Sequence, residues 1–374
     1  MQGRFIRAGE TMADRSNPYT SLPSSAFWRT AVAEVDTFGL SGMWTSRWEL
    51  PSDCRFATYG SCFAQHISRA LKERKIGWID AEPAPARTPE VLAKAYNYGV
   101  FSARTANIYT AAQLLLLTRL ALGETEADVP ELWEDKKRFY DSLRPAIEPD
   151  GFETKDEAIL SRKAMLRAFR RSFAEADVFV FTLGLTEGWE HATTGQPYAM
   201  CPGTHAGRFD PEEHVFRNYR HAEIRDALVA AFALMRSVNP GLRFLLTVSP
   251  VPLTATASGK HVLVATTYSK SVLRAVAGEL VETDDRIDYF PSYEIVTGGR
   301  SRAEFFEENM RSVRPEGVAH VMTHFFAGLR MAGRKAHAGA VDAAQVARRR
   351  RLAQEMREEQ LACEEAALES FNRG

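Results

Sequence analysis

The sequence predicts an α/β fold with a mainly parallel sheet, because short apolar runs alternate with helical patterns along the chain. Four apolar runs are typical of buried strands, at 55–59, 177–183, 242–248 and 287–290. Helical patterns lie between them, at about 63–75, 156–174, 222–237 and 268–281. Strands that alternate with helices of this length need crossover connections, which place helices on both faces of a parallel sheet.

Each predicted element has its own local justification. The strands at 177–183 (DVFVFTL) and 242–248 (LRFLLTV) are apolar on both faces, as a sheet covered on both sides requires. In the first helix, Phe63, Ile67 and Leu71 recur every four residues and form one apolar face. Lys75 follows near the C-terminal end, where a cation suits the helix dipole.

Composition narrows the class of protein. The 47 basic and 48 acidic residues give a net charge of −1, which provides no global field to attract nucleic acid or an anionic membrane. The four cysteines show no C-x-x-C spacing, so neither a disulfide framework nor a metal site is expected. No segment offers about 18 uninterrupted apolar residues, and the N-terminal stretch lacks a signal-peptide core. We therefore expect a cytoplasmic protein with no cofactor and no membrane insertion.

Three regions are predicted. Residues 1–40 form an N-terminal arm, 41–330 form the main domain, and 331–374 form a charged helical tail, with Met1 and Met12 as alternative starts. The tail contains an arginine run at 348–351, for which contact with nucleic acid or phosphate is one interpretation. Acidic residues follow at once, which favours a solvated helical face instead.

In a parallel α/β sheet, ligands bind beyond the carboxyl ends of the strands. This rule selects the loops at 60–62, 184–188, 249–251 and 291–294, and the stretch at 97–99 is a further candidate. The first loop holds Ser61 and Cys62, which we expect to face solvent at the start of a helix. There, unpaired N–H groups would lower the pKa of a thiol and stabilise an oxyanion. The alternative is that Ser61 caps the helix and Cys62 is a small buried residue.

Several motifs, in order, resemble the GSCFA-domain family over about residues 40–326. They are GSCFA at 60–64, NYG at 97–99, TLGLTEGW at 182–189, FDPEEHVFRN at 209–218, LTVSPVPL at 246–253, YSKSVLRA at 268–275 and YFPSYEIV at 289–296. This family looks like a branch of the SGNH (GDSL-like) hydrolases. The resemblance implies a three-layer α/β/α sandwich with a flavodoxin-like sheet, and acyl-ester chemistry.

The resemblance also implies site residues. When residues 60–62 are aligned with the Gly-Asp-Ser motif of SGNH enzymes, Cys62 takes the place of the nucleophilic serine and Ser61 takes that of the aspartate. Gly99 and Thr186 then correspond to oxyanion-hole donors. The Asp-x-x-His motif that supplies the base has Asn309 and Ser312 in its place, so base and orienting acid are both missing.

Other residues remain candidates for the site. His261, in a presumed loop, is a candidate base, and His205 and His214 occupy another loop. Asn97, Glu187 and Lys270 are candidate substrate-binding residues. His320 and His324 are four residues apart, as metal ligands can be, but they lie in an apolar packing helix without a third ligand nearby.

These motifs and the composition leave three interpretations of the function. The first is an ester hydrolase or O-acyltransferase for acylated carbohydrates or small esters, with a Cys62 or Ser61 nucleophile and a backbone oxyanion hole. The alternative is a non-catalytic protein that binds a glycan or acyl ligand and has lost the Asp-x-x-His base. A scaffold that acts through the charged C-terminal helix is a third interpretation. The expected partner is a small-molecule or glycan substrate.

Overall fold

The structure, a computed structural model, describes residues 17–126, 130–299, 304–333 and 364–372. The chain divides into two compact units, Met1–Ser41 and Gly42–Gly374. The first unit contains only short helical turns in its described part: η1 (Pro18–Ser21), η2 (Ser24–Ala26), η3 (Arg29–Ala33) and η4 (Thr37–Gly39).

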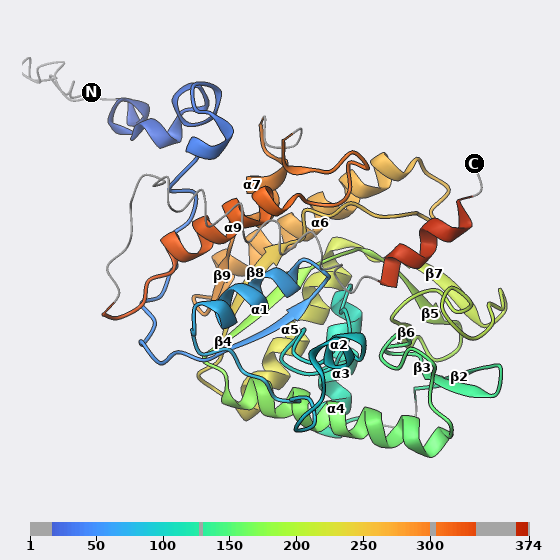
Figure 1. Cartoon of the computed structure of the whole chain (residues 1–374). Coiled ribbons are helices and arrows are strands. Elements are labelled where there is room, and N and C mark those ends of the chain that lie inside the picture. The colour runs from blue at the N-terminus through green and yellow to red at the C-terminus, as the bar shows by residue number, and fades with distance from the viewer. Residues whose placement is uncertain (1–16, 127–129, 300–303, 334–363, 373–374) are drawn as a thin grey trace, which may run out of the picture. The chain divides into compact units, whose positions relative to one another are not determined.

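A four-stranded parallel sheet lies at the centre of the second unit (Figure 1). Its strands run in the order β1 (Phe56–Gly60), β4 (Val178–Leu183), β8 (Arg243–Val248) and β9 (Ile287–Tyr289). The four predicted strands are confirmed, each to within one residue at either end.

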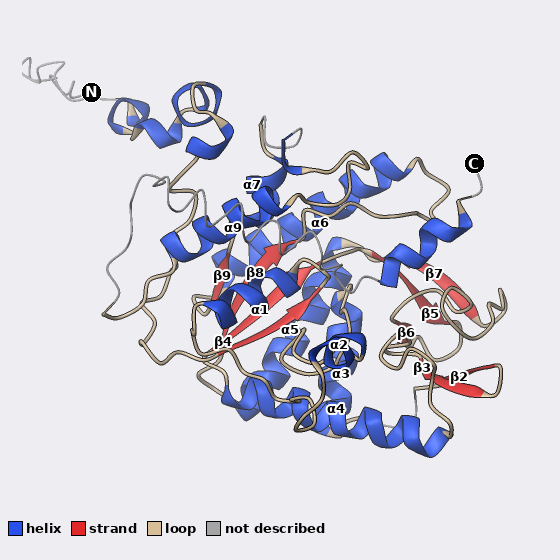
Figure 2. Cartoon of the chain, in the orientation of Figure 1, coloured by secondary structure: helices blue, strands red, loops and turns tan. Residues whose placement is uncertain are grey.

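Helices cover both faces of this sheet, which confirms the predicted three-layer α/β/α architecture (Figure 2). Successive strand residues point to opposite faces, so Phe179 and Phe181 join one core cluster while Val178 and Val180 join the other. The first cluster includes residues of α3 (Ala111–Leu122), α4 (Lys155–Glu175), α5 (His221–Val238) and α6 (Val262–Thr283). The second includes residues of α1 (Ala64–Glu73), α7 (Ser292–Thr297) and α9 (Pro315–Gly328).

Local sequence explains where the helices start. Thr154 and Glu157 form a capping box at α4, and Thr110 and Gln113 form one at α3. The predicted range 268–281 is too short for α6, which begins at Val262. His261 caps this helix by accepting a hydrogen bond from the Leu263 N–H group at 3.2 Å, so the residues after it are helical and not loop.

Two small sheets and three helices, namely a short helix and the helices α3 and α7 described above, were not predicted. One sheet has three strands in the order β6 (Pro197–Tyr198), β5 (Glu187–His191) and β7 (His214–Asn218), and follows β4 in the chain. The other is the hairpin of β2 (Leu132–Asp135) and β3 (Arg138–Asp141). The short helix is α2 (Glu90–Ala95).

An irregular segment, not a fifth strand, covers the outer edge of β1. The Phe56 N–H group donates to the Gly77 carbonyl at 2.7 Å, and the Ile79 N–H group donates to the Phe56 carbonyl at 2.9 Å. Farther along, the Ile108 N–H group donates to the Gly60 carbonyl at 2.9 Å. Residues just before α3 therefore lie beside the end of β1, where the candidate site is expected.

The predicted tail lies largely outside the described residues, which exclude 334–363 and with them the arginine run at 348–351. Its described end is the 3-10 helix η5 (Glu364–Phe371). In the part of the chain that the structure describes, no helix combines the length and the apolar character needed to cross a membrane.

Candidate functional site at the carboxyl ends of the strands

The turn after β1 is closely packed against β4. Gly60 has φ +129°, and a Cβ atom there would lie 2.3 Å from the Thr182 carbonyl oxygen, so only glycine fits. The Ser61 N–H group donates to that same oxygen at 3.0 Å. These contacts fix the sharp strand-to-helix turn that the sequence predicts.

Ser61 and Cys62 are both buried, at 3% exposure each, so the prediction that they face solvent is wrong. Their environments differ. The side chain of Ser61 lies against Gly184, and its buried hydroxyl has no hydrogen-bond partner among the described residues. Cys62 belongs to the apolar cluster that includes Phe63 and Val318, and the close packing of α1 and α9 over the sheet explains its burial.

The first amide groups of α1 are already used within the turn. The N–H groups of Ala64, Gln65 and His66 donate to the carbonyls of Ser61, Cys62 and Phe63, at 2.9, 3.1 and 3.2 Å. An N–H group that is bonded within the turn cannot also stabilise an oxyanion. These three N–H groups, which were expected as oxyanion donors, are therefore already bonded at the start of the helix.

Gly99 does not lie beside Ser61, contrary to its expected role in the oxyanion hole. Its carbonyl accepts a hydrogen bond from Lys72 Nζ at 2.6 Å, and Lys72 is in the last turn of α1. Ala64 begins that helix, about 12 Å away along its axis. Asn97 lies near Gly99, in the turn after α2, with φ +57° and its N–H group donating to the Lys94 carbonyl.

Thr186, Lys270 and Gly184 form a buried polar group at the end of β4. The Thr186 hydroxyl donates to Asn218 Oδ1 at 2.8 Å, and its N–H group donates to Ser269 Oγ at 3.0 Å. Lys270 Nζ donates to the Gly184 carbonyl at 2.7 Å. The predicted residues Thr186 and Lys270 do come together here. However, the hydroxyl and the N–H group of Thr186 both donate to other residues of the protein.

The candidate histidines His205, His214, His320 and His324 occupy structural positions. His214 Nδ1 accepts a hydrogen bond from the Asp210 N–H group at 2.9 Å, and the His205 ring packs edge-on against Tyr140. His320 and His324 are buried on α9 with their Nε2 atoms 3.1 Å apart. Within the described ranges, no group of three or more His, Cys, Asp or Glu side chains is arranged to hold a metal ion.

Asn309 and Ser312, which stand where the base motif is expected, bond to each other. Asn309 Oδ1 accepts from the Ser312 N–H group at 2.9 Å, and Asn309 Nδ2 donates to Ser312 Oγ at 3.0 Å. Neither side chain can take a proton from a nucleophile at neutral pH. His261, the other candidate base, is exposed and caps α6.

An apolar cavity of about 310 Å³ opens beyond these strand ends, between the start of α3 and the three-stranded sheet. Its walls are mainly aliphatic and aromatic and include Tyr109, Leu185, Trp189, Tyr198, Met200, Phe216 and Leu253. The Tyr109 backbone and Ser61 Cβ both approach Gly184, so Ser61 lies just behind this wall. Sequence reasoning missed the cavity, because its residues come from widely separated stretches.

Few polar groups reach the cavity. Glu187 Oε1 accepts a hydrogen bond from the Thr256 hydroxyl at 2.8 Å, and both residues line the wall. Burial raises the pKa of Glu187. The hydrogen bond from Thr256 and the charge of Lys260 lower this pKa, but they offset the effect of burial only in part. Cys201 also lines the wall, and burial raises the pKa of its thiol to about 11, so it is not a thiolate at neutral pH. Glu187 is thus the predicted substrate-binding residue that does line a cavity.

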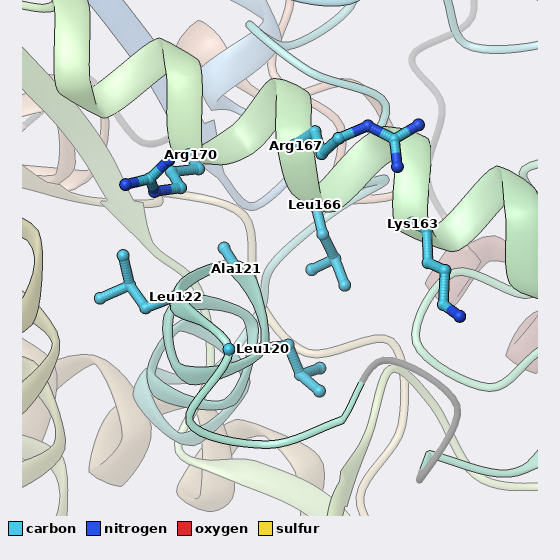
Figure 3. A pocket seen from close by; sticks show the side chains of 8 residues that line it. Leu120, Ala121, Leu122, Lys163, Leu166, Arg167 and Arg170 are labelled. Carbon is cyan, nitrogen blue, oxygen red and sulfur yellow. The ribbon is translucent and has the colours of Figure 1, made fainter.

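A second hollow, of about 380 Å³, has a different character (Figure 3). It lies between the C-terminal end of α3 and the middle of α4, lined by Leu120, Leu122, Lys163, Arg167 and Arg170. Gln113 of α3 lines the apolar cavity and Leu120 lines this hollow, so about 10 Å separates the two along that helix. The basic hollow is therefore separate from the apolar cavity.

Comparison with models of protein families identifies the family of the chain. No curated protein and no solved structure matched the chain. The model of the GSCFA family matches residues 55–325, which span the sequence from β1 into α9 and include every strand of the parallel sheet. The protein belongs to the GSCFA family.

Proposed function

We propose that the protein binds an apolar, acyl-type ligand in the cavity beside the strand ends and does not hydrolyse it. The observation that carries this proposal is the cavity itself, which has apolar walls, about 310 Å³ of space and a few polar groups at one side. It also lies where parallel α/β sheets bind their ligands. The apolar lining favours an acyl chain over a glycan, whose hydroxyl groups would need many more partners.

The absence of a suitably placed base supports binding without turnover. An SGNH-like hydrolase needs a base that takes the proton of its nucleophile. In the described residues the Ser61 hydroxyl has no hydrogen-bond partner, and Asn309 and Ser312 are exposed and bonded to each other.

Equilibrium binding of a fluorescent fatty acid, dansyl-undecanoic acid, tests this proposal. We expect saturable micromolar binding, and at least tenfold weaker binding for Ala255→Trp, which narrows the cavity. Ala192→Trp, on an exposed residue away from the cavity, serves as the matched control and should bind as the wild type does. Equal affinity in all three proteins, or no saturable binding, would contradict the proposal.

A hydrolase or O-acyltransferase is the second candidate, and one observation favours it. The Ser61 hydroxyl is a buried polar group without a partner, which proteins seldom keep without a reason. Hydrolysis of para-nitrophenyl acetate, compared between the wild type and Ser61→Ala and Cys62→Ala variants, tests this candidate. Activity that either substitution abolishes would establish turnover and would refute binding alone.

A further inference from the structure

The C-terminal end of the chain forms part of the cavity wall. Leu368 and Phe371 of η5 line the same cavity as Trp189 and Phe216, although about 150 residues separate Phe216 from them in the sequence. Figure 1 shows η5 in red near β7. The last described helix therefore contacts the region where we expect the ligand.

The geometry of η5 suits a cover. A 3-10 helix has three residues per turn, so Leu368 and Phe371 lie one above the other on the same face. Glu369 and Ser370, between them, are exposed. The segment thus directs an apolar pair toward the cavity and polar residues toward solvent.

The cover is only partly buried. Leu368 is half-buried, and Phe371 remains 58% exposed although its ring lines the cavity. A permanent part of the core would bury an aromatic ring almost completely, because each buried ring contributes strongly to stability. The contact therefore releases little free energy, so an apolar ligand that enters the cavity can displace it.

We propose that η5 is an intramolecular cover of the cavity, whose Leu368 and Phe371 close the cavity in the free protein and are displaced when the apolar ligand enters. The proposal rests on the proposed function and adds its regulation. Only the open form binds the ligand. The apparent affinity is therefore the affinity of the open form multiplied by the fraction of molecules that are open.

The test measures dansyl-undecanoic acid binding to the full chain with Leu368→Ser and Phe371→Ser together. We expect at least fivefold tighter binding and faster association, because no cover needs to leave. The matched control, Glu369→Gln with Asn372→Ser, changes exposed residues of the same segment and should behave as the wild type does. Unchanged or weaker binding by the first variant would overturn the proposal, since η5 would then be inert or a fixed part of the site.

A second measurement separates the cover from the ligand. A fluorescein-labelled peptide of residues 364–374 should bind the Leu368→Ser, Phe371→Ser protein saturably, whereas a peptide with the same two serines should not. Peptide binding without fatty-acid binding would support the cover and refute the proposed function. Fatty-acid binding without peptide binding would leave the function standing and overturn the cover.

Discussion

At the scale of single residues, the buried hydroxyl of Ser61 contrasts with that of Ser172 on α4. Ser172, also buried, bonds to the Tyr59 hydroxyl at 2.7 Å and to the Phe169 carbonyl. Ser61 Oγ has no such partner. A buried polar group without a partner costs about 1–3 kcal/mol of stability, whereas a bonded one does not.

This contrast predicts opposite effects for the same substitution. Ser61→Ala should raise the free energy of unfolding by about 1 kcal/mol, because it removes an unsatisfied hydroxyl. Ser172→Ala should lower it by about 1–3 kcal/mol, because it leaves the Tyr59 hydroxyl unpaired. Urea unfolding of both variants measures the difference. A loss of stability in Ser61→Ala would mean that the hydroxyl has a partner in solution.

The buried ring of His66 should make the stability of the fold depend on pH. Burial, with a smaller effect of Arg69, lowers the pKa of His66 to about 3, so the ring is neutral in the folded protein. In the unfolded chain its pKa is about 6.5, so below that pH only the unfolded chain takes up the proton. The His66 contribution therefore destabilises the fold by about 1.4 kcal/mol per pH unit as pH falls from about 6.5 toward 3.

The comparison with His66→Gln isolates this contribution. The variant lacks the titrating group, so the stability of the wild type relative to the variant should decline as pH falls from about 7 to about 4.5. Urea unfolding of both proteins over this range measures it. A difference that stays constant with pH would mean that His66 is accessible to protons in the folded state.

At the scale of elements, Asp141 joins the small hairpin to α4. The last residue of β3, it accepts hydrogen bonds from Arg144 Nε at 2.9 Å and Arg162 Nη2 at 2.6 Å, and all three side chains are fully buried. Burial alone would raise the pKa of Asp141, but Arg162 and Arg144 outweigh it and lower the pKa below its usual range. The carboxylate therefore stays charged and bonds to both guanidinium groups.

Asp141→Asn should lower the free energy of unfolding by about 3–5 kcal/mol, because it leaves buried positive charge uncompensated. Glu134→Gln, which neutralises an exposed carboxylate in β2 of the same hairpin, should change it by less than about 0.5 kcal/mol. Thermal unfolding of the two variants compares them. If Asp141→Asn lowers the free energy of unfolding as little as Glu134→Gln does, the buried ion pairs do not hold the hairpin on α4.

The elements also differ in how well the sequence predicts them. Strands β1, β4, β8 and β9 are buried on both faces, so short, mainly apolar runs locate them to within one residue. The start of α6 was missed because its first residues, VLVATT, are rich in β-branched side chains of low helix propensity. Strand β5, EGWEH, is mostly charged or polar, and its pairing with β6 and β7 makes it a strand.

The candidate site was predictable to a smaller extent. The position rule for parallel sheets selects the correct edge, and Ser61, Thr186, Glu187 and Lys270 do lie there. Burial of Ser61 and Cys62 depends on helices packed from later in the chain, and the remote place of Gly99 depends on an irregular segment. Local patterns contain no information on either.

At the scale of the whole molecule, the cavity joins parts of the fold that are otherwise separate. Its wall takes residues from the start of α3, the three-stranded sheet, the loop after β8 and η5. None of these alone encloses an apolar space, so the cavity exists only in the folded chain. A ligand that fills it binds the native state and not the unfolded state.

This coupling predicts that dansyl-undecanoic acid stabilises the protein. At a concentration a hundred times its dissociation constant, it should raise the free energy of unfolding by about 2.7 kcal/mol, seen as a higher urea midpoint. Ala255→Trp should lose this gain. Arg167→Ala, in the basic hollow of Figure 3, should keep it, because the acyl chain and not the carboxylate provides most of the binding. Loss of the gain in Arg167→Ala but not in Ala255→Trp would place the fatty acid in the basic hollow and remove the apolar cavity as its site.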